Sequence, residues 1–353
     1  MKFWHDKNVL ITGNTGFKGS WLTLWLKEIG ANVYGYSLAP ETNPNMYKSC
    51  NLDKNLTTYI SDIYDFKKLK LCITETQPEI IFHMAAQPLV IESYLKPYYT
   101  LNTNIVGTYN LLESIREIDS IKVLINITTD KVYENTENNH AFKETDKLGG
   151  DDIYSVSKAC SDLITSSYKK SFFTNEKDNI AISTARSGNV IGGGDWASNR
   201  LVPDIVKSVN KNELVKIRNP QSTRPWQHVI EPLYGYILLA EQMYANDPNV
   251  FSSGWNFGPS SKQEESVSSV SQKLLKLYGK NDLYSPSSES YIFKESELLK
   301  LDCTKSEKYL SWKSNLTIDE TLSLTHEWYA SYYNSENMYD VTYNQIKSYM
   351  DKL

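Results

Sequence analysis

Asn8-Val-Leu-Ile-Thr-Gly-Asn-Thr-Gly-Phe-Lys-Gly-Ser-Trp-Leu22 is the stretch that decides the fold. It begins with a short apolar run typical of a buried strand, and an apolar helical pattern follows its three glycines. We expect Gly13 to form the tight turn and Gly16 to let the backbone approach a pyrophosphate, whose charge the free N–H groups of the helix start would bind. The stretch therefore predicts a strand, a turn and a helix that hold a dinucleotide.

A second apolar run, Ala31 to Tyr36, favours this interpretation over an ordinary glycine-containing turn. Ser37 stands where an acidic residue would bind the adenosine ribose, and Glu41 is the nearest carboxylate. The choice between NAD and NADP is therefore open from these residues alone. A third strand is predicted from Tyr59 to Ile63, and its Asp62 is either an adenine contact or a surface residue.

Composition narrows the class of protein. The 353 residues, 40% of them hydrophobic, suffice for one large α/β domain and a smaller one. A net charge of −5 without a basic block predicts neither a nucleic-acid partner nor a membrane surface. The four cysteines lie far apart, so we expect no metal site and reduced thiols in the cytoplasm. The polar start and the lack of a long apolar run agree with a soluble protein.

The remaining chain continues the alternation of strands and helices. Apolar strands are predicted at Glu79–Gln87 and Ile121–Ile127, with a helix at Asn102–Glu113 between them. The stretch from Ser183 to His228 has the composition of loops that wrap a ligand. We expect a Rossmann-like, doubly wound parallel sheet over residues 1–180. Residues 181–353 would form mainly a smaller C-terminal substrate-binding lobe, with the chain crossing back to the first domain.

Chemically reactive side chains follow the strand that ends at Ile127. Thr129, Asp130 and Lys131 come directly after it, at the edge where parallel sheets bind ligands. Tyr154 and Lys158 are four residues apart, which places both on one helix face. A lysine beside a phenol lowers the tyrosine pKa from about 10 toward neutrality, as a general base for an alcohol requires.

Together these motifs resemble the extended short-chain dehydrogenase/reductase family, and within it the nucleotide-sugar 4,6-dehydratases. The segments that carry the resemblance are GNTGFKGSWL (13–22), HMAAQPLV (83–90), TDK (129–131), GNVIGGGDW (188–196), RPWQHV (224–229) and GWNFGP (254–259). Lys131 is the discriminating residue, because members that act on CDP-glucose carry Asp-Lys here and members that act on dTDP-glucose carry Asp-Glu.

The resemblance implies oxidation of the sugar at C4, loss of water across C5 and C6, and return of a hydride to C6. NAD is the implied cofactor, CDP-glucose the implied substrate, a dimer or tetramer the implied assembly, and deoxysugar and surface-polysaccharide synthesis the implied use. The implied catalytic residues are Thr129, Asp130, Lys131, Tyr154 and Lys158, with Asp130 as acid and Lys131 as base. The implied cofactor contacts are Gly13, Thr15, Gly16, Phe17, Gly19, Asp62, Ile63, Ala85, Ala86 and Gln87, together with Tyr154 and Lys158, and the implied substrate contacts are Asn189, Arg200, Leu201, Arg224 and Trp226.

Two positions depart from the family pattern, and three further functions stay open. Ile91 stands in place of an arginine, and Val156 in place of an asparagine. A nucleotide-sugar 4-epimerase would need no acid and base at C5 and C6, so Asp130 and Lys131 argue against it. A dehydratase of a dTDP- or GDP-sugar would keep the same residues with a different nucleotide pocket. A binding protein that has lost its chemistry would have no need to keep all five catalytic residues.

Overall fold

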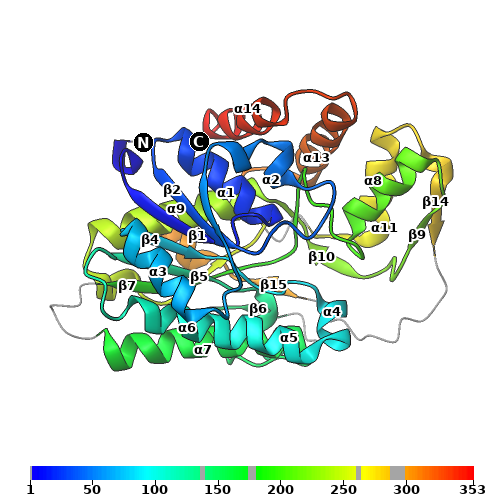
Figure 1. The fold of residues 1–353 in the computed structure, drawn as a ribbon. Helices are drawn as coiled ribbons and strands as arrows, with labels where there is room; N and C mark the ends of the chain where they lie inside the picture. Colours follow the sequence, from blue (N-terminus) through cyan, green and yellow to red (C-terminus); the bar gives the residue numbers. More distant parts are fainter. Residues whose placement is uncertain (1, 136–139, 174–179, 260–263, 287–298) are drawn as a thin grey trace.

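A seven-stranded parallel sheet forms the centre of the computed structural model, which describes residues 2–135, 140–173, 180–259, 264–286 and 299–353 (Figure 1). The strand order is β12-β7-β5-β4-β1-β2-β3, so the expected doubly wound sheet is confirmed. The order reverses between β1 and β4, where such sheets bind their ligands. The strands are β1 (Asn8–Thr12), β2 (Asn32–Ser37), β3 (Thr57–Ile60), β4 (Ile80–His83), β5 (Val123–Ile127), β7 (Ala181–Ser187) and β12 (Gly254–Phe257).

Helices cover both faces of this sheet. The long helices are α1 (Phe17–Glu28), α3 (Phe66–Thr76), α6 (Gly107–Ile115), α7 (Ile153–Phe172), α8 (Leu201–Lys211), α9 (Ile230–Ala245), α11 (Val267–Leu277), α13 (Ile318–Tyr333) and α14 (Met338–Met350). The short helical segments are η1 (Lys2–Trp4), α2 (Met46–Ser49), η2 (Leu52–Lys54), α4 (Val90–Leu95), α5 (Pro97–Leu101), the π-helix η3 (Asn102–Val106), η4 (Asp130–Val132), α10 (Pro248–Phe251), η6 (Asn281–Leu283) and α12 (Thr304–Leu310). Among the described helices, none has both the length and the apolar character needed to span a bilayer.

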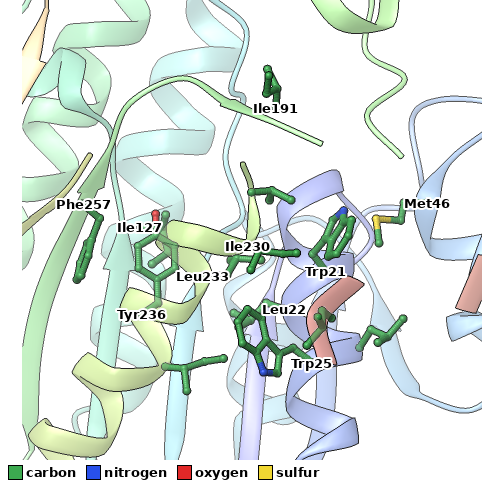
Figure 2. Close-up of a cluster of buried hydrophobic side chains, with 14 of the residues drawn as sticks. Trp21, Leu22, Trp25, Met46, Ile127, Ile191, Ile230, Leu233, Tyr236 and Phe257 are labelled. Atoms are coloured by element: carbon green, nitrogen blue, oxygen red, sulfur yellow. The ribbon is translucent and has the colours of Figure 1, made fainter. Parts of the chain in front are cut away.

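Burial on both faces explains why the central strands are almost continuously apolar. Every residue of β4, β5 and β7 is buried. One face packs against α3, α6 and α7, and the other against α1 and α9. Figure 2 shows the core on the α1 and α9 side of the sheet, where Trp21, Leu22 and Trp25 of α1 lie opposite Ile230 and Leu233 of α9. Full burial of one such large apolar side chain contributes about 1.5–3 kcal/mol.

A smaller lobe lies beside the carboxyl ends of the strands. In Figure 1 it contains α8 and α11 with a two-stranded sheet of β9 and β14. The short strands are β6 (Ala141–Phe142), β8 (Val190–Ile191), β9 (Val215–Ile217), β10 (Thr223–Pro225), β11 (Gln227–His228), β13 (Glu264–Ser266), β14 (Tyr284–Pro286) and β15 (Lys300–Leu301). The chain beyond residue 180 also returns to the large sheet twice, as β7 and β12, so the lobe is an insertion among elements of that sheet.

Three local expectations need correction. The third strand is Thr57–Ile60 rather than Tyr59–Ile63, because its pairing with β2 ends where Ile60 meets Ser37. The stretch predicted as loops contains most of the buried strand β7 and the whole of helix α8. The predicted helix at Asn102 begins as the π-helix η3 and becomes α6 only from Gly107.

Candidate active site

The turn between β1 and α1 has the geometry that close approach of a phosphate needs. Gly13 adopts a left-handed φ of +78°, and a Cβ there would lie 2.7 Å from the Ala85 nitrogen. A Cβ on Gly19 would lie 2.2 Å from the Gly13 carbonyl oxygen. Gly16, at the N-cap of α1, is exposed, so the first N–H groups of the helix remain accessible. This cradle suits a dinucleotide pyrophosphate.

A single cavity of about 550 Å³ extends from this turn to the smaller lobe. It brings together every predicted site residue except one. The predicted residues that line it are Gly13, Thr15, Gly16, Phe17, Gly19, Asp62, Ile63, Ala85, Ala86, Thr129, Asp130, Lys131, Tyr154, Lys158, Asn189, Arg200, Leu201, Arg224 and Trp226. Gln87 is the exception, since it is buried behind the wall and its side chain bonds Leu89 and Thr100. These hydrogen bonds hold the loop after β4 in place.

The end of the cavity near β2 carries carboxylates. Its walls there include Ser37, Glu41 and Asp62, and the Thr15 hydroxyl bonds Ser37 Oγ at 2.7 Å. Among the lining residues between positions 36 and 63, none is a lysine or arginine. A ribose 2′-phosphate would meet negative charge and no cation at this end, which favours a cofactor without that phosphate.

The side chains after β5 form a hydrogen-bonded acid. Thr129 Oγ1 donates to Asp130 Oδ1 at 3.0 Å, and Asp130 is only 2% exposed. Burial raises the pKa of Asp130, although Lys131, Thr129 and Arg224 act in the opposite direction. A raised pKa keeps the carboxyl group protonated over a wider pH range, as a proton donor requires. Lys131 also lines the cavity and is partly exposed.

Tyr154 and Lys158 share one face of α7, as expected, but their pKa values differ from the expectation. Burial raises the pKa of Tyr154 to about 12, while a hydrogen bond between its side chain and Thr129 and the charge of Arg200 lower it. Lys158 donates through Nζ to the Ile127 carbonyl at 2.9 Å, and burial lowers its pKa to about 7. The polypeptide around the phenol therefore does not itself produce the lowered pKa predicted from the sequence.

Lys18 is a site residue that the sequence did not reveal. It lies in the first turn of α1, lines the cavity, and donates through Nζ to Ser187 Oγ and Tyr236 Oη, both at 3.0 Å. Burial lowers its pKa to about 7, and its charge also lowers the pKa of Lys158. The site thus contains two lysine amines, and the charge of Lys18 lowers the pKa of Lys158.

A buried ion pair fixes the helix that carries Tyr154 and Lys158. Arg186 on β7 binds Asp162 on α7 through two nitrogens, each at 2.9 Å, and both side chains are 4% exposed. The Thr128 hydroxyl also donates to Asp162, and the negative charge of Asp162 raises the pKa of Lys158. This bidentate pair aligns α7 with the ends of β5 and β7.

The predicted substrate residues surround the part of the cavity nearest the smaller lobe. Arg200 Nη1 donates to Asp195 Oδ2 at 2.9 Å, and the charge of Arg200 lowers the pKa of Tyr154. Arg224 is 8% exposed, and its charge acts on Asp130. The indole of Trp226 donates to the Glu265 carbonyl, which fixes its ring in the wall. Two arginines beside the reaction centre suit a diphosphate.

Within the described ranges, no three His, Cys, Asp or Glu side chains gather in the way that a metal ion would need.

Comparison with known proteins gives a consistent set of relatives. The family model described as GDP-mannose 4,6 dehydratase matches residues 10–325. A CDP-glucose 4,6-dehydratase of Salmonella typhimurium is 44% identical over 351 residues, which cover 99% of this chain and 97% of that protein.

Two solved structures share the fold. A dTDP-glucose 4,6-dehydratase of Bacillus anthracis in complex with NAD has a TM-score of 0.76 at 21% identity, over 92% of this chain and 97% of its own. A UDP-glucose 4-epimerase of Thermotoga maritima with UDP-glucose also has a TM-score of 0.76, at 22% identity over 92% of this chain and 99% of its own. Because dehydratases and epimerases share this fold, the side chains of the site must distinguish the reactions.

Proposed function

Because the chain belongs to the GDP-mannose 4,6-dehydratase family of nucleotide-sugar dehydratases, we propose that it converts CDP-glucose to CDP-4-keto-6-deoxyglucose and water. It is an NAD-dependent nucleotide-sugar 4,6-dehydratase. The 44% identity to the Salmonella enzyme over almost the full length of both chains supports CDP-glucose as the substrate.

NAD is the cofactor, and the glycine turn, Thr15, Asp62, Ala85 and Ala86 would hold it. NAD held by these residues would supply the hydride chemistry of the reaction, since its oxidised form can take a hydride from C4 and its reduced form can return one to C6. The carboxylates Glu41 and Asp62 at the end of the cavity near β2 support NAD over NADP.

The first chemical task is the removal of a proton from the 4-hydroxyl group, which we assign to the Tyr154 oxygen. The charge of Arg200 favours the phenolate against the burial that raises the pKa of Tyr154, and Lys158 lies four residues further along α7. Thr129, whose hydroxyl bonds Asp130 and influences Tyr154, would orient the oxygen at C4 by a hydrogen bond. Tyr154, Lys158 and Thr129 all line the same cavity.

The second task is the loss of water, which needs a base at C5 and an acid at C6. We assign the acid to Asp130, because its burial raises the pKa of the carboxyl group and so favours the protonated form, and the base to Lys131. The keto group at C4 makes the C5 hydrogen acidic enough for an amine to remove. A proton on Asp130 then leaves with the 6-hydroxyl group as water.

The observation that carries this proposal is the presence of Asp130 and Lys131 in the same cavity as Tyr154 and Lys158, with Asp130 near enough for its charge to act on Tyr154. A 4-epimerase needs only Tyr154 and Lys158, since no bond at C5 or C6 is broken in that reaction. A chain that only bound the cofactor would need neither pair.

Incubation with CDP-glucose tests the proposal. The purified protein with NAD should yield a product 18 mass units lighter, about the mass of one water, without net reduction of NAD. dTDP-glucose serves as the comparison substrate, and the Asp130→Asn variant as the matched control for the elimination. Epimerised CDP-glucose with unchanged mass would instead establish an epimerase.

A homo-oligomer, dimer or tetramer, is the assembly that we propose. α5, α6 and α7 lie together along one edge of the molecule in Figure 1, and they expose the apolar side chains of Tyr98 (81% exposed), Tyr109, Leu163 and Phe172. A second copy of the chain would cover them. Sedimentation of the wild-type protein and a Leu163→Arg variant tests this, since a monomeric wild-type protein would exclude it.

We also propose a cytoplasmic location, which agrees with four cysteines that form no disulfide.

A further inference from the structure

Asp204 and Arg218 form a charged pair at the far end of the cavity that the reaction described above does not use. Asp204 lies in the first turn of α8, and Arg218 follows β9 directly. Arg218 Nη2 lies 3.6 Å from Asp204 Oδ2, and both residues line the cavity. The side chain of Arg218 is 31% exposed and that of Asp204 is 41% exposed, so solvent or a ligand in the cavity can reach both.

The position of the pair along the cavity indicates which part of the substrate it meets. Arg224 lies near Asp130, and Arg200 lies near Tyr154, as their effects on those pKa values require. Arg200 begins the turn of α8 that Asp204 completes, since the Asp204 N–H bonds the Arg200 carbonyl oxygen. Beyond the sugar, a nucleotide sugar consists of a diphosphate and then a nucleoside. With the diphosphate at the two arginines, the base would lie at Asp204 and Arg218.

The walls around the pair suit a flat heterocycle. Apolar side chains of α8 and β9, those of Val202, Pro203, Val215 and Ile217, line the cavity at the same end. An apolar slot that ends in a few directed polar groups is the usual form of a base pocket. The pair would then contact the edge of the base, and the apolar side chains would contact its faces.

We infer that Asp204 and Arg218 select cytosine by bonding its Watson–Crick edge, an inference that rests on the proposed CDP-glucose activity. Cytosine presents an amino donor at N4 next to acceptors at N3 and O2. The Asp204 carboxylate accepts from N4, and the Arg218 guanidinium donates to N3 and O2. Uracil and thymine carry an acceptor at position 4 and a donor at N3, so each would place its oxygen against the carboxylate and its N–H against the guanidinium.

Binding of CDP and UDP, measured by titration calorimetry on the full-length protein, tests the inference without requiring turnover. The wild-type protein should bind CDP about 10- to 100-fold more tightly than UDP, the selectivity typical of one bidentate base contact. Asp204→Asn should reduce this ratio to within about 3-fold, because the amide can donate to the uracil oxygen at position 4. Arg218→Gln provides a second test that does not depend on the folding of the first variant.

The matched control is Glu213→Gln, an acid-to-amide change at an exposed residue between α8 and β9 that does not line the cavity. It should leave the ratio unchanged. Equal binding of CDP and UDP by the wild-type protein, tighter binding of GDP, or an unchanged ratio in both folded variants would overturn the inference. Selective CDP binding without dehydration of CDP-glucose would contradict the proposed function and leave the base contact supported.

Discussion

Replacement of Lys158 by methionine should make the protein more stable at pH 7 while it abolishes the dehydration. Burial lowers the pKa of this amine from 10.5 to about 7, so the folded protein holds the proton less tightly than the unfolded chain does. Between those two values the unfolded chain binds more protons. The free energy of unfolding therefore rises with pH through this window. Below pH 7 it is reduced by the full free energy of holding a charged amine in the protein interior.

The size of the effect follows from the pKa values. The lowering from 10.5 to about 7 corresponds to about 5 kcal/mol at about 1.4 kcal/mol per pKa unit, of which about 4 kcal/mol acts at pH 7 and about 1.4 kcal/mol at pH 9.5. Methionine removes this cost but leaves the Ile127 carbonyl without its donor, at about 2 kcal/mol. Lys158→Met should thus be about 2 kcal/mol more stable than the wild-type protein at pH 7 and slightly less stable at pH 9.5.

Urea denaturation without ligands, at one protein concentration and at both pH values, measures this difference. Lys170→Met is the matched control, because Lys170 is an exposed lysine on the same helix, and it should change the stability by less than about 0.5 kcal/mol. Two results together would refute this reasoning: a Lys158→Met variant less stable than the wild-type protein at pH 7, and the same change of stability with pH in both proteins. They would show that burial of the Lys158 amine does not destabilise the folded protein.

Three further substitutions test other parts of the structure. Tyr154→Phe should lower kcat about 100- to 10,000-fold, with little change in KM for the nucleotide sugar, because the phenol acts on a proton rather than in binding; a large rise in KM in steady-state kinetics would contradict this. Asp130→Asn should slow water loss about 100-fold or more while oxidation at C4 continues, so that rapid quench and mass spectrometry detect a 4-keto sugar with its 6-hydroxyl group intact; equal slowing of both steps would count against the acid role. Gly193→Ala should lower the free energy of unfolding by about 2 kcal/mol or more, because the new Cβ would lie 1.9 Å from the Trp328 ring, and an unchanged thermal midpoint would show that the ring moves freely.

The parts of the fold that could be predicted are those where local sequence and tertiary environment agree. β1 and β5 are continuous apolar runs, and glycines mark the turn that follows β1. The pattern does not reveal β7, because Thr184 and Arg186 interrupt its apolar run, and a charge at that depth is explained by buried partners that lie elsewhere in the chain, Asp162 above all. The loop composition around α8 conceals that helix, although Pro203 stands in its first turn, a position where proline is common.

The candidate site divides in a similar way. Tyr154 and Lys158 could be placed together because one helix spacing relates them. Lys18 could not be recognised, since its partners Ser187 and Tyr236 lie 169 and 218 positions away in the chain. The spacing predicts the wrong direction for the pKa of Tyr154, because it reveals the neighbouring charge but not the burial that outweighs it.

The contact between α1 and α14 has a consequence for biosynthesis. The indole of Trp25, on α1, meets the Tyr349 ring of α14 at 6.2 Å between centroids. A ribosome needs roughly 15 to 65 seconds to add the residues between the two at usual elongation rates. Throughout that interval the nascent chain carries the apolar surface of its cofactor-binding helix without α14, one of the two helices that pack against Trp25. Such a chain is a natural substrate for chaperones that shield apolar segments during translation.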